Sequence, residues 1–189
     1  MLKINGAEFR NVYLSLKAKV GKTMKQLFQR YAAYNLWANR IIVEQVNQLS
    51  EEQIHKEIVS SFTSIYKTIL HMMDVESVWW QRLKLAEHVE WPSKNFEGNL
   101  EELSKRLLQS SQQWEEWVRS ANEANVTHVF AYQNSKKEQF KQPVFEMLLQ
   151  LFNHQTYHRG QLVTILRQLG IEKIPATDFI VFSRSVKGR

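Results

Sequence analysis

Cysteine is absent from this chain, and glycine and proline are scarce. The 189 residues include only 6 Gly and 3 Pro. Without cysteine there can be no disulfide, no thiolate metal ligand and no cysteine nucleophile, and the composition suits a reducing compartment. We therefore expect a cytoplasmic protein. Few glycines and prolines mean few tight turns, which favours long helices.

Long apolar runs are also missing. No stretch of about 20 apolar residues is present, so we expect no membrane span and no membrane partner. Residues 1–23 lack the apolar run of a secretory signal and show no clear helical period. The length suits one domain, and a 43% hydrophobic composition can form one substantial core. We expect the domain to span residues 24–189 and interpret residues 1–23 as a leader or an artificial extension.

The excess of basic charge is unevenly distributed. The formal net charge is +6, but residues 1–23 hold five basic residues and one acidic residue, a net of +4. The remainder holds 20 basic and 18 acidic residues, a net of +2. A nucleic-acid-binding face needs a concentrated basic surface. The nearly balanced body therefore argues against a nucleic-acid partner, although the basic leader leaves that alternative some support.

Apolar residues recur at three- and four-residue steps in four segments, which predicts four long amphipathic helices. These cover residues 24–49, 64–87, 99–121 and 143–169. Ser50 with Gln53 forms a capping-box pattern, Asn99 can cap the third helix, and Gly170 can end the last one. Residues 126–143 indicate two short strands around a polar turn. The expected fold is all-α: a four-helix bundle with a small β-hairpin inserted before the last long helix.

Two histidines lie four residues apart in the last predicted helix. His154 and His158, in FNHQTYHRGQ, would stand one turn apart on the same helix face. Their nitrogens could then approach one ion from the same side, as in other HxxxH ligand pairs. This spacing alone is a weak signal, because two histidines can also be hydrogen-bonded side chains of a core.

A third histidine, His71, lies among the apolar residues of LHMMDVESVWW and should face inward. Facing helices of a bundle build cofactor sites from inward side chains. Three imidazoles would give a divalent metal three neutral ligands and leave it an open position, as in catalytic sites. Without a metal, each of the three rings would need partners for two nitrogens. His71, His154 and His158 are therefore candidate metal ligands.

At these residues the sequence resembles the DinB-like (YfiT-type) family of metal-dependent helical-bundle proteins, a branch that includes thiol-dependent transferases. The resemblance runs from Met24 to about Arg184 and rests on YNLWANR, LHMMDVESVWW, NHQTYHRGQ and PATDFIVF, in that order. It implies a four-helix bundle, a divalent metal on His71, His154 and His158, and often a homodimer. The segment before Met24 departs from the family pattern.

Three neighbouring residues are candidates for supporting roles. Arg159 could bind an anionic substrate group at the mouth of a pocket, or could be an ordinary solvent-exposed helix arginine. Asp74 lies one turn from His71 and could accept a hydrogen bond from an imidazole, which would fix its tautomer. Asn153 could do the same beside His154, unless it faces solvent.

The functional expectation is a metal-dependent enzyme acting on a small molecule. A metal could activate a substrate thiol, which makes a thiol-dependent S-transferase, or a water molecule, which makes a hydrolase. Any thiol, such as a low-molecular-weight thiol, must come from outside the chain. A non-catalytic metal-binding stress protein is the other alternative. Three imidazoles suit zinc, nickel or iron, and ligand type alone does not select one of them.

Overall fold

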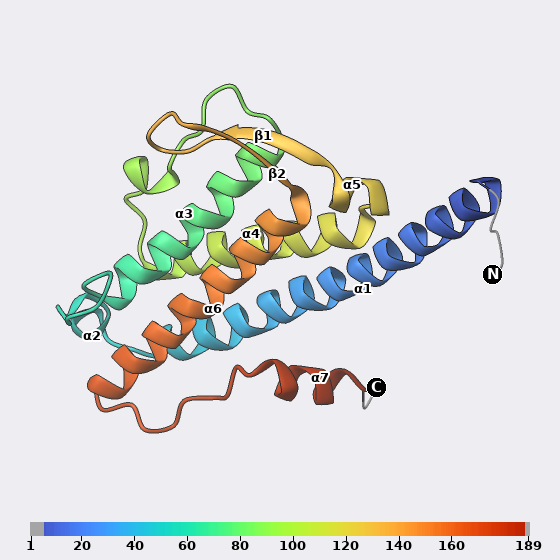
Figure 1. Ribbon diagram of the computed structural model, residues 1–189. Helices are drawn as coiled ribbons and strands as arrows, with labels where there is room; N and C mark the ends of the chain where they lie inside the picture. Colours follow the sequence, from blue (N-terminus) through green and yellow to red (C-terminus); the bar gives the residue numbers. More distant parts are fainter. Residues whose placement is uncertain (1–5, 188–189) are drawn as a thin grey trace.

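Four long helices form the body of the protein in the computed structural model, which describes the backbone of residues 6–187 and the side chains of residues 23–185 (Figure 1). The elements in chain order are α1 (Gly6–Val46), α2 (Glu51–His55), α3 (Ile65–Leu83), the 3₁₀ turn η1 (Pro92–Asn95), α4 (Leu100–Ser120), α5 (Glu123–Thr127), β1 (Val129–Gln133), β2 (Gln139–Pro143), α6 (Val144–Gln168) and α7 (Phe179–Lys187).

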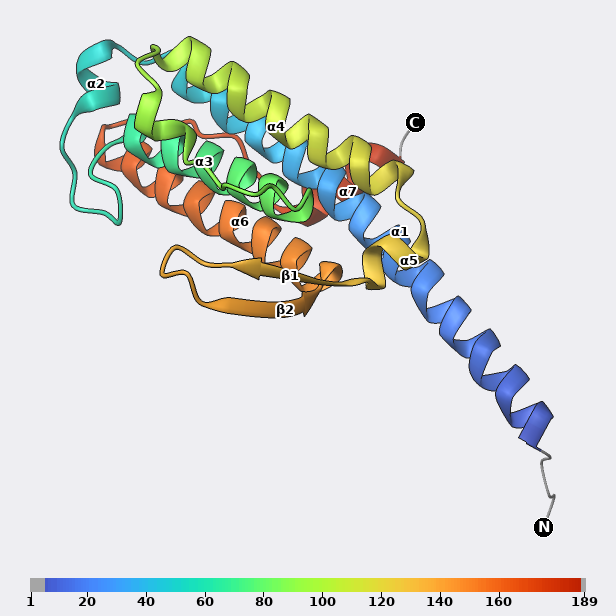
Figure 2. The ribbon, with the colours of Figure 1, turned by 90° about the horizontal axis from the view of Figure 1, so that it is seen from above.

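The long helices surround a common core. α1 and α3 lie diagonally opposite each other, and each packs against both α4 and α6. β1 and β2 pair antiparallel, with Val129 opposite Pro143, and cross the end of the bundle where α3 finishes and α6 begins (Figures 1 and 2). This confirms the predicted four-helix bundle with a hairpin before the last long helix.

Local side-chain chemistry sets several helix ends where the sequence predicts them. Ser50 accepts a hydrogen bond from the backbone of Gln53, whose side chain returns one to Ser50, so the capping box is complete. Asn99 accepts from the backbone N–H of Glu102 and starts α4. Gly170 adopts a φ of 83° just after α6, the left-handed conformation that ends helices.

Other boundaries differ from the prediction. α1 begins at Gly6 rather than near Met24, so the first helix starts earlier than its apolar period predicts. The helix expected to reach residue 87 ends at Leu83, because Leu85 turns left-handed and the Ala86 N–H donates to the carbonyl of Gln81. Neither α5 nor α7 was expected to be helical. The domain boundary at residue 24 stays a prediction.

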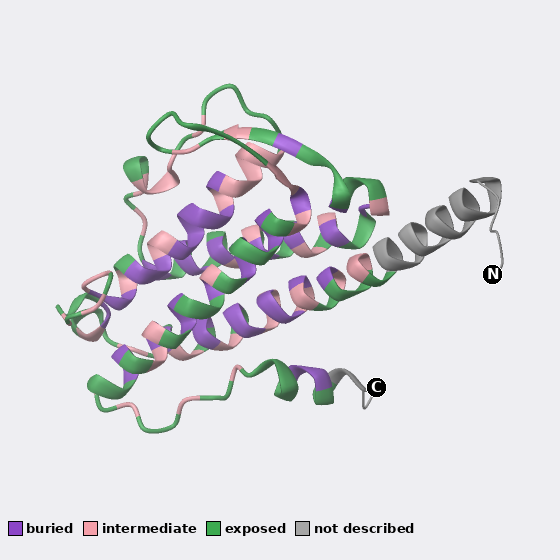
Figure 3. Ribbon diagram, viewed as in Figure 1, coloured by how far each residue is buried: buried purple, intermediate pink, exposed green. Residues whose placement is uncertain are grey.

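The core of the described residues has three apolar clusters, and polar residues separate the two larger ones. One apolar cluster includes Ile42, Ile69 and Leu103, and the other includes Phe28 and Trp114. Figure 3 shows the buried residues along the inward faces of the long helices. Within the described part of the chain, no helix is both long and apolar enough to cross a membrane.

A buried polar layer crosses the bundle between the two clusters. We define it by five residues, of which α1 supplies two and each other long helix supplies one: Asn35, Asn39, Glu76, Ser111 and Arg159. On every helix these positions lie between residues of the two apolar clusters. The layer lies at the level of His158, which precedes Arg159 in α6.

Candidate metal centre

Three histidines from two helices meet at one point. His71 lies in the second turn of α3, which Ser64 caps by accepting from the backbone of Lys67. His154 and His158 are one turn apart in α6. The His154 Nε2 atom is 3.1 Å from Nε2 of His71 and 3.1 Å from Nε2 of His158. Among the residues whose side chains are described, no other group of three His, Cys, Asp or Glu could hold a metal ion.

The separations suit a shared ion. Bonds from zinc to imidazole nitrogen are about 2.0–2.1 Å long, which places two ligand nitrogens roughly 2.9–3.4 Å apart for angles between a right angle and the tetrahedral value. Both 3.1 Å separations fall within that interval. These three side chains could therefore bind a metal ion, as the sequence predicts.

The hydrogen bond of His158 points its free lone pair toward the other histidines. His158 Nδ1 is 2.7 Å from Oε1 of Gln161. The amide nitrogen of Gln161 donates to Ser61 and Tyr157, so its oxygen faces the imidazole and can only accept. His158 must then carry its proton on Nδ1, which leaves Nε2 unprotonated, the tautomer that a metal ligand needs.

Burial keeps the rings neutral. Burial, together with repulsion from His154 and His158, lowers the pKa of His71 to about 4. Burial and repulsion from His158 lower the pKa of His154 to about 4 as well. Burial also lowers the pKa of His158, although the hydrogen bond that its ring donates to Gln161 raises it. At neutral pH all three imidazoles can therefore coordinate without first losing a proton.

These shifts predict acid-resistant metal binding. An ordinary imidazole with a pKa near 6.5 would be mostly protonated at about pH 5.5. Because the pKa values of His71 and His154 lie at about 4, we expect zinc affinity to stay level from pH 8 to about 6 and to fall only as the pH approaches those values. Zinc titration against a chromophoric chelator across this range measures it. Half-loss near pH 6.5 contradicts the prediction.

Aromatic side chains pack against two of the three histidines, His71 and His158. The ring of Phe62, in the loop before α3, stacks on His71 with centroids 4.1 Å apart and lies 5.6 Å from His158. Tyr157 meets His158 edge-on at 5.0 Å. Ser61 accepts from Gln161 at 2.7 Å, which ties this loop to the residue that orients His158. The loop thus covers one side of His71 and His158.

Gln161 should tune metal affinity without contacting the ion. In Gln161→Leu the His158 Nδ1–H loses its acceptor, so the ring loses its fixed tautomer. We expect metal affinity to fall by roughly ten- to a hundredfold, the usual effect of removing a partner that orients a ligand. Competitive zinc titration measures it, with Gln150→Leu, an exposed position on the same helix, as the matched control. A change below twofold contradicts this role.

Arg159 lies elsewhere than predicted. Its side chain is 2% exposed, and its guanidinium donates to Asn35 and Asn39 at 2.8 Å each and to Thr156 at 2.8 Å. Neither a solvent-exposed arginine nor one at a pocket mouth fits this position. The correction has a physical reason: Arg159 is on the face of α6 that enters the core, so its charge is directed into the polar layer and away from any substrate.

Asp74 and Asn153 do not orient the histidines in this structure. Asp74 is buried, but its Oδ1 accepts from the backbone N–H of Ser93, which fixes η1 against α3. Asn153 is exposed and accepts from the hydroxyl of Tyr31. The supporting role predicted for these two residues belongs to Gln161.

Glu76 is the carboxylate of the polar layer. It is fully buried and accepts from Ser111 at 2.9 Å and from Asn35 at 3.0 Å. Burial raises the pKa of Glu76 to about 7, although the hydrogen bonds from Ser111 and Asn35 and the charge of Arg159 lower it. Asn35 and Asn39 both bridge Glu76 to Arg159, so two buried opposite charges share two amides.

Two of the cavities in the described structure are well formed, and the three histidines line neither of them. A cavity of about 330 Å³ lies beside α6, where Tyr157, Gln161 and the loop residue Ser60 contribute to its wall. It adjoins the side chains that orient and cover His158. A larger one lies at the hairpin end of the bundle.

A family model and a similar known protein both relate this chain to the same family. The DinB family model matches residues 23–186. Protein DinB of Bacillus subtilis (strain 168) is 30% identical over 155 residues, which covers 77% of this chain and 87% of that protein.

Solved structures share the fold at lower identity. A DinB-like protein from Bacillus cereus ATCC 10987 has a TM-score of 0.56 at 17% identity, over 74% of this chain and 89% of its own. A DinB family protein from Exiguobacterium sibiricum 255-15 has a TM-score of 0.59 at 17% identity, over 82% and 97%. With its matched span and its bundle of four long helices, this chain belongs to the DinB family.

Proposed function

We propose that the chain is a metal-dependent enzyme in which His71, His154 and His158 bind one divalent transition metal, either zinc, nickel or iron. The convergence of three neutral imidazole nitrogens, with His154 Nε2 at 3.1 Å from both others, carries the proposal. Three neutral ligands leave the ion its full charge and at least one open position, as in catalytic rather than structural sites.

A bound metal would supply a Lewis acid that lowers the pKa of a coordinated thiol or water. The chain's own residues hold the ligands in place. Gln161 fixes the tautomer of His158, and Phe62 and Tyr157 exclude bulk water from one side. A small substrate could approach past Tyr157, because the cavity beside it is open to solvent.

We favour transfer of an external thiol over hydrolysis. A hydrolase usually needs a general base beside the activated water. Within the described side chains, the two buried carboxylates near His71 in sequence are engaged elsewhere: Asp74 with Ser93 and Glu76 with the polar layer. A thiol needs no such base once its pKa is lowered, and a low-molecular-weight thiol must supply the sulfur, since the chain has no cysteine.

A transfer assay tests this function. Untagged protein loaded separately with zinc, nickel or iron would be incubated with glutathione, cysteine or coenzyme A and a small electrophile, either an alkyl halide or an α,β-unsaturated ketone. We expect a thioether formed faster than in buffer, with halide released or a proton added to the ketone's α-carbon. His71→Ala should abolish the rate and the exposed-site variant Gln150→Leu should retain it.

An assay without thioether formation would select one of the alternative functions. Bound metal with no thioether and no ester or amide hydrolysis would leave the non-catalytic metal-binding protein as the function. Hydrolysis without transfer would select the hydrolase alternative. Homodimer formation and the cytoplasmic location stay predictions, which size-exclusion chromatography with light scattering and cell fractionation address.

A further inference from the structure

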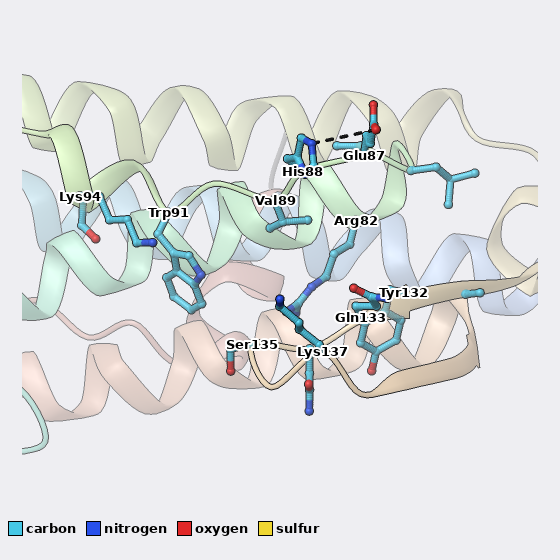
Figure 4. A pocket seen from close by; sticks show the side chains of 15 residues that line it. Arg82, Glu87, His88, Val89, Trp91, Lys94, Tyr132, Gln133, Ser135 and Lys137 are labelled. Atoms are coloured by element: carbon cyan, nitrogen blue, oxygen red, sulfur yellow. Dashed lines mark ion pairs between the residues drawn. The ribbon is translucent and has the colours of Figure 1, made fainter.

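The larger cavity lies away from the histidines. It occupies about 850 Å³ between the end of α3, the loop of residues 84–94 and the hairpin (Figure 4). We call it the hairpin cleft and define it by Arg82, Trp91, Lys94, Tyr132 and Lys137, which are among its lining residues. Its volume lies in the range of small-molecule sites, about 300–1,000 Å³.

Arg82 is the central group of the hairpin cleft. Its guanidinium lies 4.7 Å from the ring centroid of Trp79 and 5.3 Å from that of Tyr132. Its Nε is buried and has no hydrogen-bond partner within the described residues, and none of their carboxylates forms an ion pair with it. Figure 4 shows the side chain reaching from α3 toward the hairpin. A half-buried guanidinium without a carboxylate partner is unusual, and an anion in the cleft, which Arg82 lines, could pair with it.

The net charge of the residues that line the cleft also favours a bound anion. Lys94 and Lys137 bring two more cations to the same cleft. The one acidic residue of the lining is Glu87, whose side chain is 91% exposed and lies 4.0 Å from His88. Without counting His88, three cations and one anion give the lining a net charge of +2. Such an excess attracts small anions.

Backbone conformation also singles out this place. Among the described residues, only two non-glycine residues have a positive φ, Leu85 at 54° and Lys137 at 63°, and both line the cleft. Leu85 follows α3 and Lys137 completes the hairpin turn, positions where glycine avoids strain. Strain of this kind concentrates at ligand sites. Leu85 and Lys137 therefore bring side chains to the cleft at two backbone positions where a glycine would be unstrained.

From these observations we propose that the hairpin cleft binds a small anion that carries a flat ring. Arg82 would pair with its carboxylate or phosphate, Lys94 and Lys137 would attract the same charge, and Trp91 and Tyr132 would contact the ring. Arginine matches either head group through parallel N–H donors, and aromatic rings favour offset or edge-on contact with another ring.

The cleft is separate from the metal centre. Arg82 is eleven residues beyond His71 on α3, which is about 16 Å along the helix axis. Buried residues of the second apolar cluster, Val75 and Leu148 among them, lie along α3 and α6 in the intervening turns. Ligand binding here therefore does not depend on a metal, and it can be tested whether or not the proposed function holds.

Isothermal titration calorimetry with phenyl phosphate and benzoate tests the proposal on the full chain. We expect one site per chain for at least one probe, weaker binding at higher salt, and no binding of benzyl alcohol. The tighter probe identifies the head group. Arg82→Gln should weaken binding at least tenfold. Arg106→Gln should leave it unchanged, because Arg106 lies over the Phe96 ring but pairs with Glu102 outside the cleft.

A second variant separates binding from folding. Lys137→Gly removes a cation and also relieves a left-handed backbone, so it should raise the melting temperature while weakening the probe about threefold. His154→Ala should bind the probe like the wild type. Four outcomes would overturn the proposal: neither probe binds, inorganic phosphate binds as well as both, Arg82→Gln binds like Arg106→Gln, or His154→Ala abolishes binding.

Discussion

Arg159→Met should lower the free energy of unfolding by about 3–5 kcal/mol, the usual effect of removing one partner of a buried charge pair. Methionine keeps most of the apolar stem, so the change isolates the guanidinium. Without it, Asn35 and Asn39 lose the donor to their carbonyl oxygens, and the Glu76 carboxylate loses its compensating charge. An effect of this size is a large fraction of the stability of an ordinary domain.

Urea denaturation followed by circular dichroism measures this loss. Arg167→Met is the matched control, because Arg167 is exposed two turns later on the same helix, and we expect it to change stability by less than about 0.5 kcal/mol. Adding Glu76→Gln to Arg159→Met should restore part of the loss, since no buried carboxylate then lacks a counter-charge. A loss below about 1 kcal/mol in Arg159→Met would contradict the polar layer as described.

The loss of unfolding free energy caused by Arg159→Met should also depend on pH. Burial raises the pKa of Glu76 to about 7 in the folded protein. A carboxyl with a raised folded-state pKa contributes stability below its unfolded pKa and loses it as the pH rises through the folded value. Removing Arg159 raises the folded pKa further, so the difference between variant and wild type should be larger at pH 8 than at pH 5.5.

Zinc should stabilise the wild-type protein strongly and His154→Ala hardly at all. A ligand that binds only the folded state adds about 4 kcal/mol at a free concentration a thousand times its dissociation constant. His154 Nε2 is the nitrogen that lies 3.1 Å from both others. Removing the His154 imidazole therefore leaves only two of the three ligands that could bind the ion. We expect a melting temperature several degrees higher with zinc for the wild type only.

Differential scanning calorimetry with and without zinc measures this effect. His128→Ala is the control, because it removes an exposed histidine outside the three-histidine cluster and should leave the zinc effect intact. An equal rise in melting temperature for His154→Ala would mean that zinc stabilises the protein through other groups.

The features that local sequence chemistry determines were predictable. Apolar spacing gave the four long helices because burial of one helix face repeats every three to four residues. Ser50 and Asn99 marked helix starts because their side chains satisfy free backbone N–H groups. The histidines were recognisable because His154 and His158 share a helix face and His71 stands among apolar neighbours.

Features that depend on packing between distant segments of the chain could not be predicted from the sequence. Arg159 shares its helix face with Leu151, Leu162 and Leu166, a signal for burial that its charge obscured. Phe62 lies in an irregular loop, where no periodicity predicts what an aromatic ring covers. The hairpin cleft joins a loop and a hairpin more than 30 residues apart, so its cations come together only in the folded chain.

Metal content of untagged protein, purified without a metal resin and measured by elemental mass spectrometry, tests the central claim most directly. Three converging imidazoles predict about one transition metal per chain in the wild type, retained in His128→Ala and lost in both His158→Ala and the double variant His71→Ala, His154→Ala. A wild type that holds no metal, even after incubation with zinc, nickel or iron, would contradict the metal centre and the enzyme built on it.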